Sequence, residues 1–251
     1  MTLNPYSLPS TNDRERYYTD DITLLPFGTI WRSMRGQAVI TRTLVFLYFT
    51  FLKVLGKRMP ANYGTRHPPC LTAIPKEQLP DEAAQAMADF TDACQAAGME
   101  HMGYYQPSWI GRKRGVLSVS MDPQRTMWCT TTWFEIQLGE QSKSRAVFAC
   151  HSETIGGEQL NTSVETAELW IPQMIPPNVT IDRIASDSAV ASIIDHHRAT
   201  IANRTDMATF DPSSLVAHIE RRSLEVCEFM VAKGFYAELT PEEIDQLRHS
   251  A

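Results

Sequence analysis

Acidic residues are missing from a long stretch near the N-terminal end of the chain. No Asp or Glu lies between Asp21 and Glu77, whereas the same interval holds eight Lys and Arg residues, a formal charge of +8. The remaining 15 basic and 29 acidic residues sum to −14, within a net charge of −6. Such an asymmetry indicates an anionic surface or an acidic partner for the basic part.

Motifs that mark several common protein classes are also missing. The five cysteines include no CxxC pair, so we expect neither a structural zinc site nor a disulfide framework, but reduced thiols. No Walker A or GxGxxG pattern follows an expected strand, so we expect no nucleotide and no cofactor. Residues 1–21 are polar and lack the apolar core of a secretory signal, which predicts an intracellular, cytoplasmic protein.

The segment 22–58 has the most unusual composition in the chain. Its centre, residues 38–55, reads AVITRTLVFLYFTFLKVL, with an uninterrupted apolar run shorter than the roughly 20 residues of a spanning helix. On a helical wheel the basic side chains fall in one narrow sector: Arg35, Arg42, Lys53 and Lys57. This pattern is typical of a helix that lies in a membrane interface, or that spans it only if the cations reach toward the headgroups.

We therefore expect residues 22–58 to dock the protein on an anionic membrane surface, on a protein partner, or on both. Trp and Tyr favour the boundary between lipid and water, and basic groups are attracted to anionic lipids. The expected location is peripheral or monotopic at the inner face of a membrane. The alternative is that the segment folds back onto its own domain. The expected contact residues are Trp31, Arg35, Arg42, Phe46, Leu47, Tyr48, Phe49, Phe51, Lys53, Lys57 and Arg58.

Composition divides the chain into four regions. Residues 1–21 are expected to form a flexible polar tail, 22–58 the docking helical segment, 59–80 a proline-rich linker, and 81–251 an α+β globular domain. In that domain we expect an antiparallel sheet of about five or six strands, flanked by an N-terminal helix and two or three C-terminal helices.

The expected elements follow from local periodicity. A helix is predicted over residues 81–97, and alternating or β-branched runs predict strands over 102–109, 116–121, 127–138, 145–153 and 166–171. Two further helices are predicted over 187–203 and from Leu215 to Gly234. Thr240, Pro241 and Glu243 form a capping box that starts a last short helix.

Three side chains are weak candidates for catalysis or ligand binding: His151, Glu153 and His197. On a strand, His151 and Glu153 share a face and can pair, whereas Cys150 points to the other face and cannot form a dyad with His151. His197 ends the string Asp195-His196-His197. Three neighbours on a helix point in different directions, so they cannot bind one metal ion. His197 also lies on the apolar helix face, where a hydrogen-bonded packing histidine is usual.

The preferred function is a non-catalytic accessory or adaptor protein that docks on a membrane or in a complex through residues 22–58. The alternative is a small hydrolase or ligand-binding domain whose pocket lies between the sheet and its helices, with His151, Glu153 or His197 as its polar groups. Trp128, Trp133 and Phe134 would suit the lining of such a cavity, but we interpret them as core packing. The basic turn Arg112-Lys113-Arg114 is interpreted as a solvent-exposed hairpin turn. Because the folded part is acidic, nucleic-acid binding is not expected.

Overall fold

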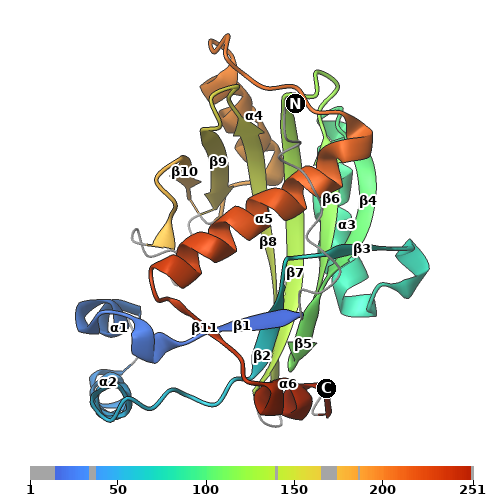
Figure 1. Ribbon diagram of the computed structural model, residues 1–251. Coiled ribbons are helices and arrows are strands. Elements are labelled where there is room, and N and C mark those ends of the chain that lie inside the picture. The colour runs from blue at the N-terminus through green and yellow to red at the C-terminus, as the bar shows by residue number, and fades with distance from the viewer. Residues whose placement is uncertain (1–14, 34–37, 139–140, 165–173, 186, 250–251) are drawn as a thin grey trace, which may run out of the picture.

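A computed structural model describes residues 15–33, 38–138, 141–164, 174–185 and 187–249. The described chain forms a mixed α+β fold with one sheet of seven strands and one of four (Figure 1). The predicted fold class is confirmed. The predicted sheet of five or six strands is wrong, because β3 (Leu71–Ile74), β9 (Gln159–Val164) and β10 (Val179–Ile184) enlarge the main sheet and strands near both ends of the sequence enter a second sheet.

The larger sheet has the strand order β10-β9-β8-β7-β6-β4-β3. All neighbours are antiparallel except β9 and β10, which are parallel. Four of its strands coincide with predicted runs, whereas the predicted strand 166–171 lies outside the described residues. The strands are β3 (Leu71–Ile74), β4 (Glu100–Pro107), β6 (Lys113–Met121), β7 (Met127–Leu138), β8 (Gln141–Glu153), β9 (Gln159–Val164) and β10 (Val179–Ile184).

The turns between these strands contain the residues from which the turns were predicted. Asp122 is buried between β6 and β7, and its carboxylate accepts hydrogen bonds from the backbone N–H groups of Met127 at 2.7 Å and Gln124 at 3.2 Å. Between β8 and β9, Gly157 has φ of 84°, a conformation that glycine adopts without a steric penalty. The predicted hairpins therefore form for local reasons.

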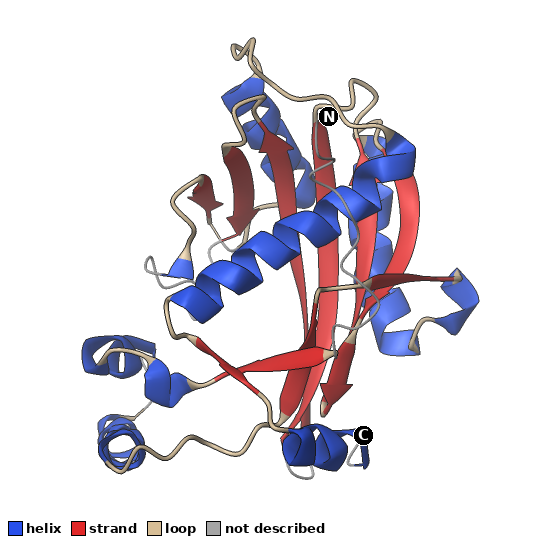
Figure 2. Cartoon of the chain, in the orientation of Figure 1, coloured by secondary structure: helices blue, strands red, loops and turns tan. Residues whose placement is uncertain are grey.

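Helices cover both faces of the larger sheet (Figure 2). On one face lie α3 (Asp81–Ala96) and α4 (Val190–Ile201), both predicted. The long helix α5 (Leu215–Ala232) crosses the opposite face. Alternation along each strand assigns every side chain to one of these two layers.

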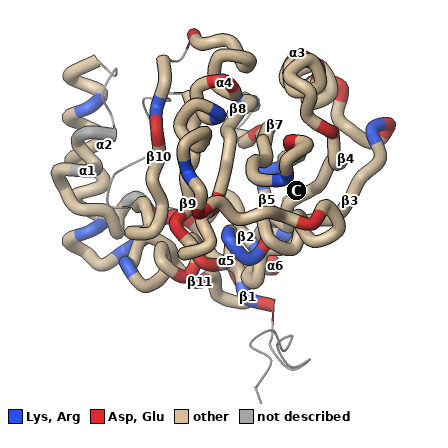
Figure 3. Tube along the Cα trace, turned by 90° about the horizontal axis from the view of Figure 1, so that it is seen from above, with Lys and Arg blue, Asp and Glu red and all other residues tan. Residues whose placement is uncertain are grey.

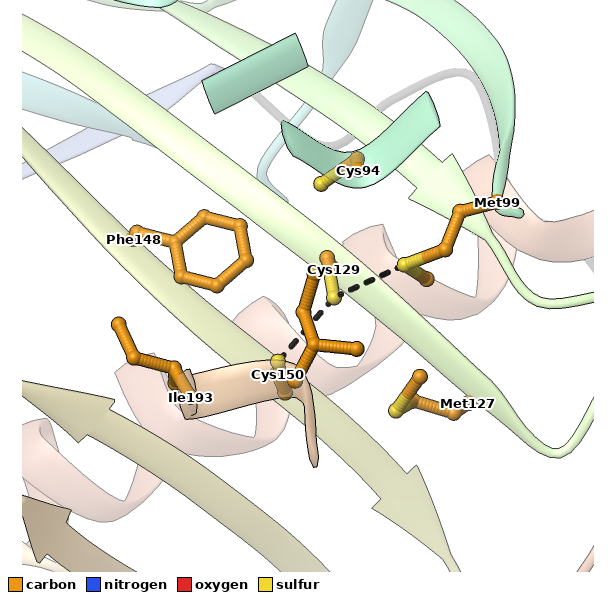
Figure 4. Close-up of a cluster of buried hydrophobic side chains, with 8 residues drawn as sticks. Cys94, Met99, Met127, Cys129, Phe148, Cys150 and Ile193 are labelled. Carbon is orange, nitrogen blue, oxygen red and sulfur yellow. Dashed lines mark hydrogen bonds between the residues drawn. The ribbon is translucent and has the colours of Figure 1, made fainter. Parts of the chain in front are cut away.

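The layer under α3 and α4 has a sulfur-rich centre, drawn in Figure 4. Cys129 and Cys150 are register partners on β7 and β8, and their Sγ atoms lie 3.1 Å apart as free thiols. Cys129 Sγ also lies 3.5 Å from Met99 Sδ. All five cysteines are free thiols in the structure, and Cys150 faces away from the His151 side of the sheet.

The smaller sheet joins distant parts of the chain in the order β11-β1-β2-β5. We expected residues 16–20 at the end of a polar tail and residues 63–67 in a linker, yet both form strands. Their hydrogen-bond partners are remote, since Tyr18 pairs with Glu238, so no local pattern reveals them. The strands are β1 (Arg16–Asp20), β2 (Tyr63–His67), β5 (Trp109–Gly111) and β11 (Tyr236–Glu238).

Three more helices lie beside the smaller sheet: α1 (Phe27–Ser33), α2 (Val39–Val54) and α6 (Pro241–His249). The capping box of α6 is confirmed. Thr240 Oγ1 accepts from the Glu243 N–H at 3.3 Å, and Glu243 Oε2 accepts from the Thr240 N–H at 2.8 Å. The segment predicted to be helical around residues 38–55 corresponds to α2.

Candidate functional site

Helix α2 presents a continuous apolar face outward. The side chains at i, i+4, i+7, i+11 and i+14 line up on this face, and none of them is buried. Ile40 and Val54, at its two ends, are 77% and 74% exposed. We call this set the outer face of α2: Ile40, Leu44, Leu47, Phe51 and Val54, with Tyr48 and Leu55 at its edge.

The opposite face of α2 packs on the protein. Phe46 and Phe49 contact the buried cluster formed by Leu25, Ile30 and residues of α5 and β11. The Phe46 ring also lies edge-on to the Trp31 indole of α1, with the ring centroids 5.3 Å apart. Both faces of the helix are therefore apolar, and the protein covers only one of them.

The two cations of α2 bind backbone carbonyls on this covered side. Arg42 donates to the Trp31 carbonyl from Nε at 3.1 Å and Nη2 at 2.7 Å, and its guanidinium lies 3.9 Å from the Trp31 ring centroid. Lys53 Nζ donates to the carbonyls of Thr23 and Leu25, both at 2.8 Å. Carbonyls at the ends of short helices lack intrahelical partners, so these cations serve as caps. They point toward the protein, not outward as a headgroup-binding arrangement requires.

The other residues expected in this segment divide between the two sides. Leu47, Tyr48 and Phe51 are exposed, and Lys57 is exposed just beyond the helix. Arg58 forms an ion pair with Glu243 and donates to the Glu238 carbonyl at 3.0 Å, which ties it to α6 and β11. Arg35 lies outside the described residues. Among the helices that the structure describes, none combines the length and apolar content of a membrane span.

A second candidate site is a cavity of about 450 Å³ between α5 and the larger sheet. Apolar side chains such as Leu117, Trp128 and Ile219 line most of it, and the smaller sheet contributes Trp109 and Tyr236 at one end. Its volume falls in the range of small-molecule sites. A cavity between the sheet and a helix is therefore present among the described residues. Trp128 lines it, whereas Trp133 packs in the core under α3 and Phe134 is not among the lining residues.

His151 lines this cavity within a chain of three hydrogen-bonded side chains. Its Nδ1 lies 2.8 Å from Asn161 Oδ1, and its Nε2 lies 2.9 Å from Thr130 Oγ1. With Asn161 as acceptor, Nδ1 carries the proton and Nε2 accepts from the threonine hydroxyl. Burial lowers the pKa of His151 to about 4, so the ring is neutral at pH 7. The arrangement orients a hydroxyl, but it lies mid-sheet, where the strand N–H groups are used by the ladder and do not form an oxyanion hole.

Glu153 shares the His151 face of the sheet, as predicted, but it has other partners. Its Oε2 accepts from Arg222 Nε at 2.8 Å and lies 3.0 Å from His218 Nε2. Burial would raise the pKa of Glu153, but the hydrogen bonds from His218 and Arg222 and the charge of Arg222 outweigh it and hold the pKa below its usual value. Arg222 also pairs with Glu225 and donates to the Gly157 carbonyl at 3.0 Å. This network fastens α5 to the sheet.

His197 lies on the opposite side of the sheet from His151 and Glu153. It is fully buried, and its ring nitrogens lie 2.9 Å from Ser152 Oγ and 2.8 Å from Thr162 Oγ1. Burial lowers its pKa to about 4. The interpretation as a hydrogen-bonded packing histidine is confirmed, and the three weak candidates do not form one site. Within the described chain no cluster of His, Cys, Asp and Glu has the arrangement of a metal site.

Sequence reasoning missed Lys113, which it assigned to an exposed basic turn. Lys113 lines the cavity, with Nζ at 4.1 Å from the Trp109 ring centroid and 4.4 Å from that of Tyr63. Gly115 makes room for Trp109, because a Cβ there would lie 2.5 Å from the indole. Arg114, its neighbour, points to the other face and pairs with Glu135. The alternation that places Lys113 on the side of Leu117 was the available signal.

Comparison with known proteins supplies no relative for this chain. No protein-family model matches it, and neither curated proteins nor solved structures give a match. Functional inference therefore depends on the outer face of α2 and on the cavity.

Proposed function

We propose that this protein is a non-catalytic, peripherally attached membrane accessory protein that docks through the outer face of α2. The observation that supports the proposal is the orientation of α2. Its cations cap carbonyls of the same chain, while its large apolar side chains point to solvent. Contiguous exposed apolar patches of this kind mark membrane or protein contacts.

The apolar area available is sufficient for reversible attachment. The central row of the outer face consists of Ile40, Leu44, Leu47, Phe51 and Val54, and each of these side chains is more than half exposed. Transfer into the acyl boundary therefore contributes about 1–2 kcal/mol per residue. The five residues of the central row contribute roughly 5–10 kcal/mol before the cost of association is subtracted. The net binding free energy that remains is typical of a helix that lies in the membrane interface, and it is much smaller than that of a helix inserted irreversibly across the membrane.

Charge favours an anionic bilayer as the occupant. Neither α1 nor α2 contains an acidic residue (Figure 3), and the acid-free interval extends to Glu77. Lys57 lies exposed just beyond the C-terminal end of α2, and a cation near an anionic headgroup contributes about 1 kcal/mol. A single convex helix face also needs no matching groove, which a protein partner would have to supply.

Vesicle flotation tests this proposal with point variants of the full chain. Deletion of residues 1–58 is unsuitable because it removes β1 from the smaller sheet. The triple variant Leu44→Ser/Leu47→Ser/Phe51→Ser should lose flotation with phosphatidylserine-containing vesicles. Ile155→Ser, which changes a 78% exposed side chain far along the chain, is the matched control and should float like wild type.

Two results would count against membrane docking. If the wild-type protein is a monodisperse monomer and floats with none of the vesicles tested, docking on a lipid surface is contradicted. Wild-type dimers that the triple variant converts to monomers would assign the outer face to a second protein chain instead.

The cavity supports a second candidate function, the binding of a small apolar molecule. We favour binding over hydrolysis because both ring nitrogens of His151 are engaged by neutral side chains and Cys150 faces the other layer. A ligand that enters should raise the melting temperature of the protein. Thr132→Phe, which fills the cavity from its floor, should abolish that shift while the variant remains folded.

A further inference from the structure

The charge of the cavity lining is unbalanced. Two cations, Lys113 and Arg222, line it, and no Asp or Glu is among the described lining residues. The Arg222 charge is already matched, since Glu153 and Glu225 both pair with it. The Lys113 charge is not matched in this way.

Half-buried Lys113 has aromatic rings for neighbours, and no carboxylate pairs with it among the described residues. Its Nζ faces Trp109 and Tyr63 and lies 5.7 Å from the Phe134 ring centroid. Burial lowers the pKa of Lys113, and the nearby Asp20 carboxylate offsets this only in part. Within the described chain no carboxylate lies within ion-pair distance of Nζ. Ring faces stabilise a cation but leave its hydrogen-bond donors unused.

The lining residues extend along the strands away from this cation. Lys113 and Leu117 share one face of β6, and Thr130 is the register partner of Val119. Six residues of strand between positions 113 and 119 correspond to about 20 Å. The walls are mainly apolar, with Leu117, Trp128 and Val226 among them. The cavity is therefore elongated, with a cation near one end.

We infer that the cavity binds an elongated apolar carboxylic acid, with the carboxylate at Lys113 and the hydrocarbon body along β6 and α5. A carboxylate would accept hydrogen bonds from Nζ and neutralise it, and the apolar walls would cover the chain. A neutral or cationic head would leave the ammonium unpaired. This inference rests on the second candidate function and names the ligand class for it.

Isothermal titration calorimetry with dodecanoate and dodecanol, below their aggregation concentrations, tests the inference. Wild type should bind dodecanoate about ten- to a hundredfold more tightly than dodecanol, the value of one charged hydrogen-bonded contact. Lys113→Met should remove this preference and leave dodecanol binding nearly unchanged. Lys113→Arg, which keeps the charge, should retain most of the preference.

The α2 variant Leu44→Ser/Leu47→Ser/Phe51→Ser serves as a control against adsorption on the outer face, and its affinities should equal those of wild type. Equal affinities of wild type for the two probes, or a preference that survives in Lys113→Met, would overturn the carboxylate assignment and leave ligand binding in place. If neither probe binds, both the assignment and the second candidate function fail.

Discussion

Replacing Lys53 with methionine should loosen α2 from the body of the protein. Lys53 Nζ holds two carbonyls, those of Thr23 and Leu25, at 2.8 Å each. Methionine keeps the apolar stem but supplies no donor, so both carbonyls lose a charged partner. The change therefore isolates the capping role of this side chain.

The expected loss follows from the geometry. A hydrogen bond from a charged donor contributes about 1.5–3 kcal/mol when it is shielded. Lys53 is only half-buried, so water screens part of this value and competes for the carbonyls. We expect Lys53→Met to lower the free energy of unfolding by about 2 kcal/mol. For a chain of this size that corresponds to a melting temperature lower by roughly 4–8 °C.

Urea unfolding followed by circular dichroism measures the loss, and hydrogen exchange of the α2 amides locates it. Lys57→Met is the matched control, because Lys57 is exposed beyond the helix and its loss should change stability by less than about 0.5 kcal/mol. Equal losses for the two variants would refute the capping role. So would a Lys53→Met protein of wild-type stability that floats less well with anionic vesicles, since that result would place Lys53 at the headgroups.

Two further predictions concern the layer under α3 and α4. His197, with a pKa of about 4 in the fold and an ordinary value near 6.5, is neutral when buried but takes up a proton in the unfolded chain. The contribution of His197 to the free energy of unfolding is therefore complete above pH 6.5 and is lost as the pH falls toward 4, by about 1.4 kcal/mol per pH unit. His197→Gln should weaken this pH dependence in urea titrations at pH 7.5 and 5. An unchanged difference between the two pH values would contradict a buried neutral His197. Iodoacetamide should label half-buried Cys70 first and reach Cys129 and Cys150 only after unfolding, since both are buried and burial raises the pKa of Cys129. Peptide mapping measures the order of labelling. Early labelling of Cys150 would show that this layer opens in the native state.

Local sequence patterns predicted those elements whose partners are close in the chain. Strands β6, β7 and β8 are joined by short turns, and each alternates clearly, so their existence and face assignment followed from periodicity. The first helical turn of α6 followed from its capping box. By contrast, β1 pairs with β11 across almost the whole chain, and a short polar strand whose partners are that remote carries no local signal.

The candidate sites were predictable only in part, for a related reason. The apolar basic segment around α2 was evident, and so was the sector that holds Arg42 and Lys53. Which side of the helix faces the protein depends on the carbonyls of Trp31, Thr23 and Leu25, whose positions are set by tertiary packing. Lys113 was missed because its aromatic neighbours come from separate strands.

The pairing of β1 with β2 in the smaller sheet shows how the segment that contains α1 and α2 is inserted into the fold. Tyr18 pairs with Thr65 and Arg16 with His67, and extending this register places Asp20 opposite Tyr63. The two strands are thus arms of one hairpin, and residues 21–62 are an insertion at its tip. A two-residue Asn-Gly turn could close the same hairpin. Such an exchange would yield a version of the protein without α1 and α2 and with the strands of both sheets complete.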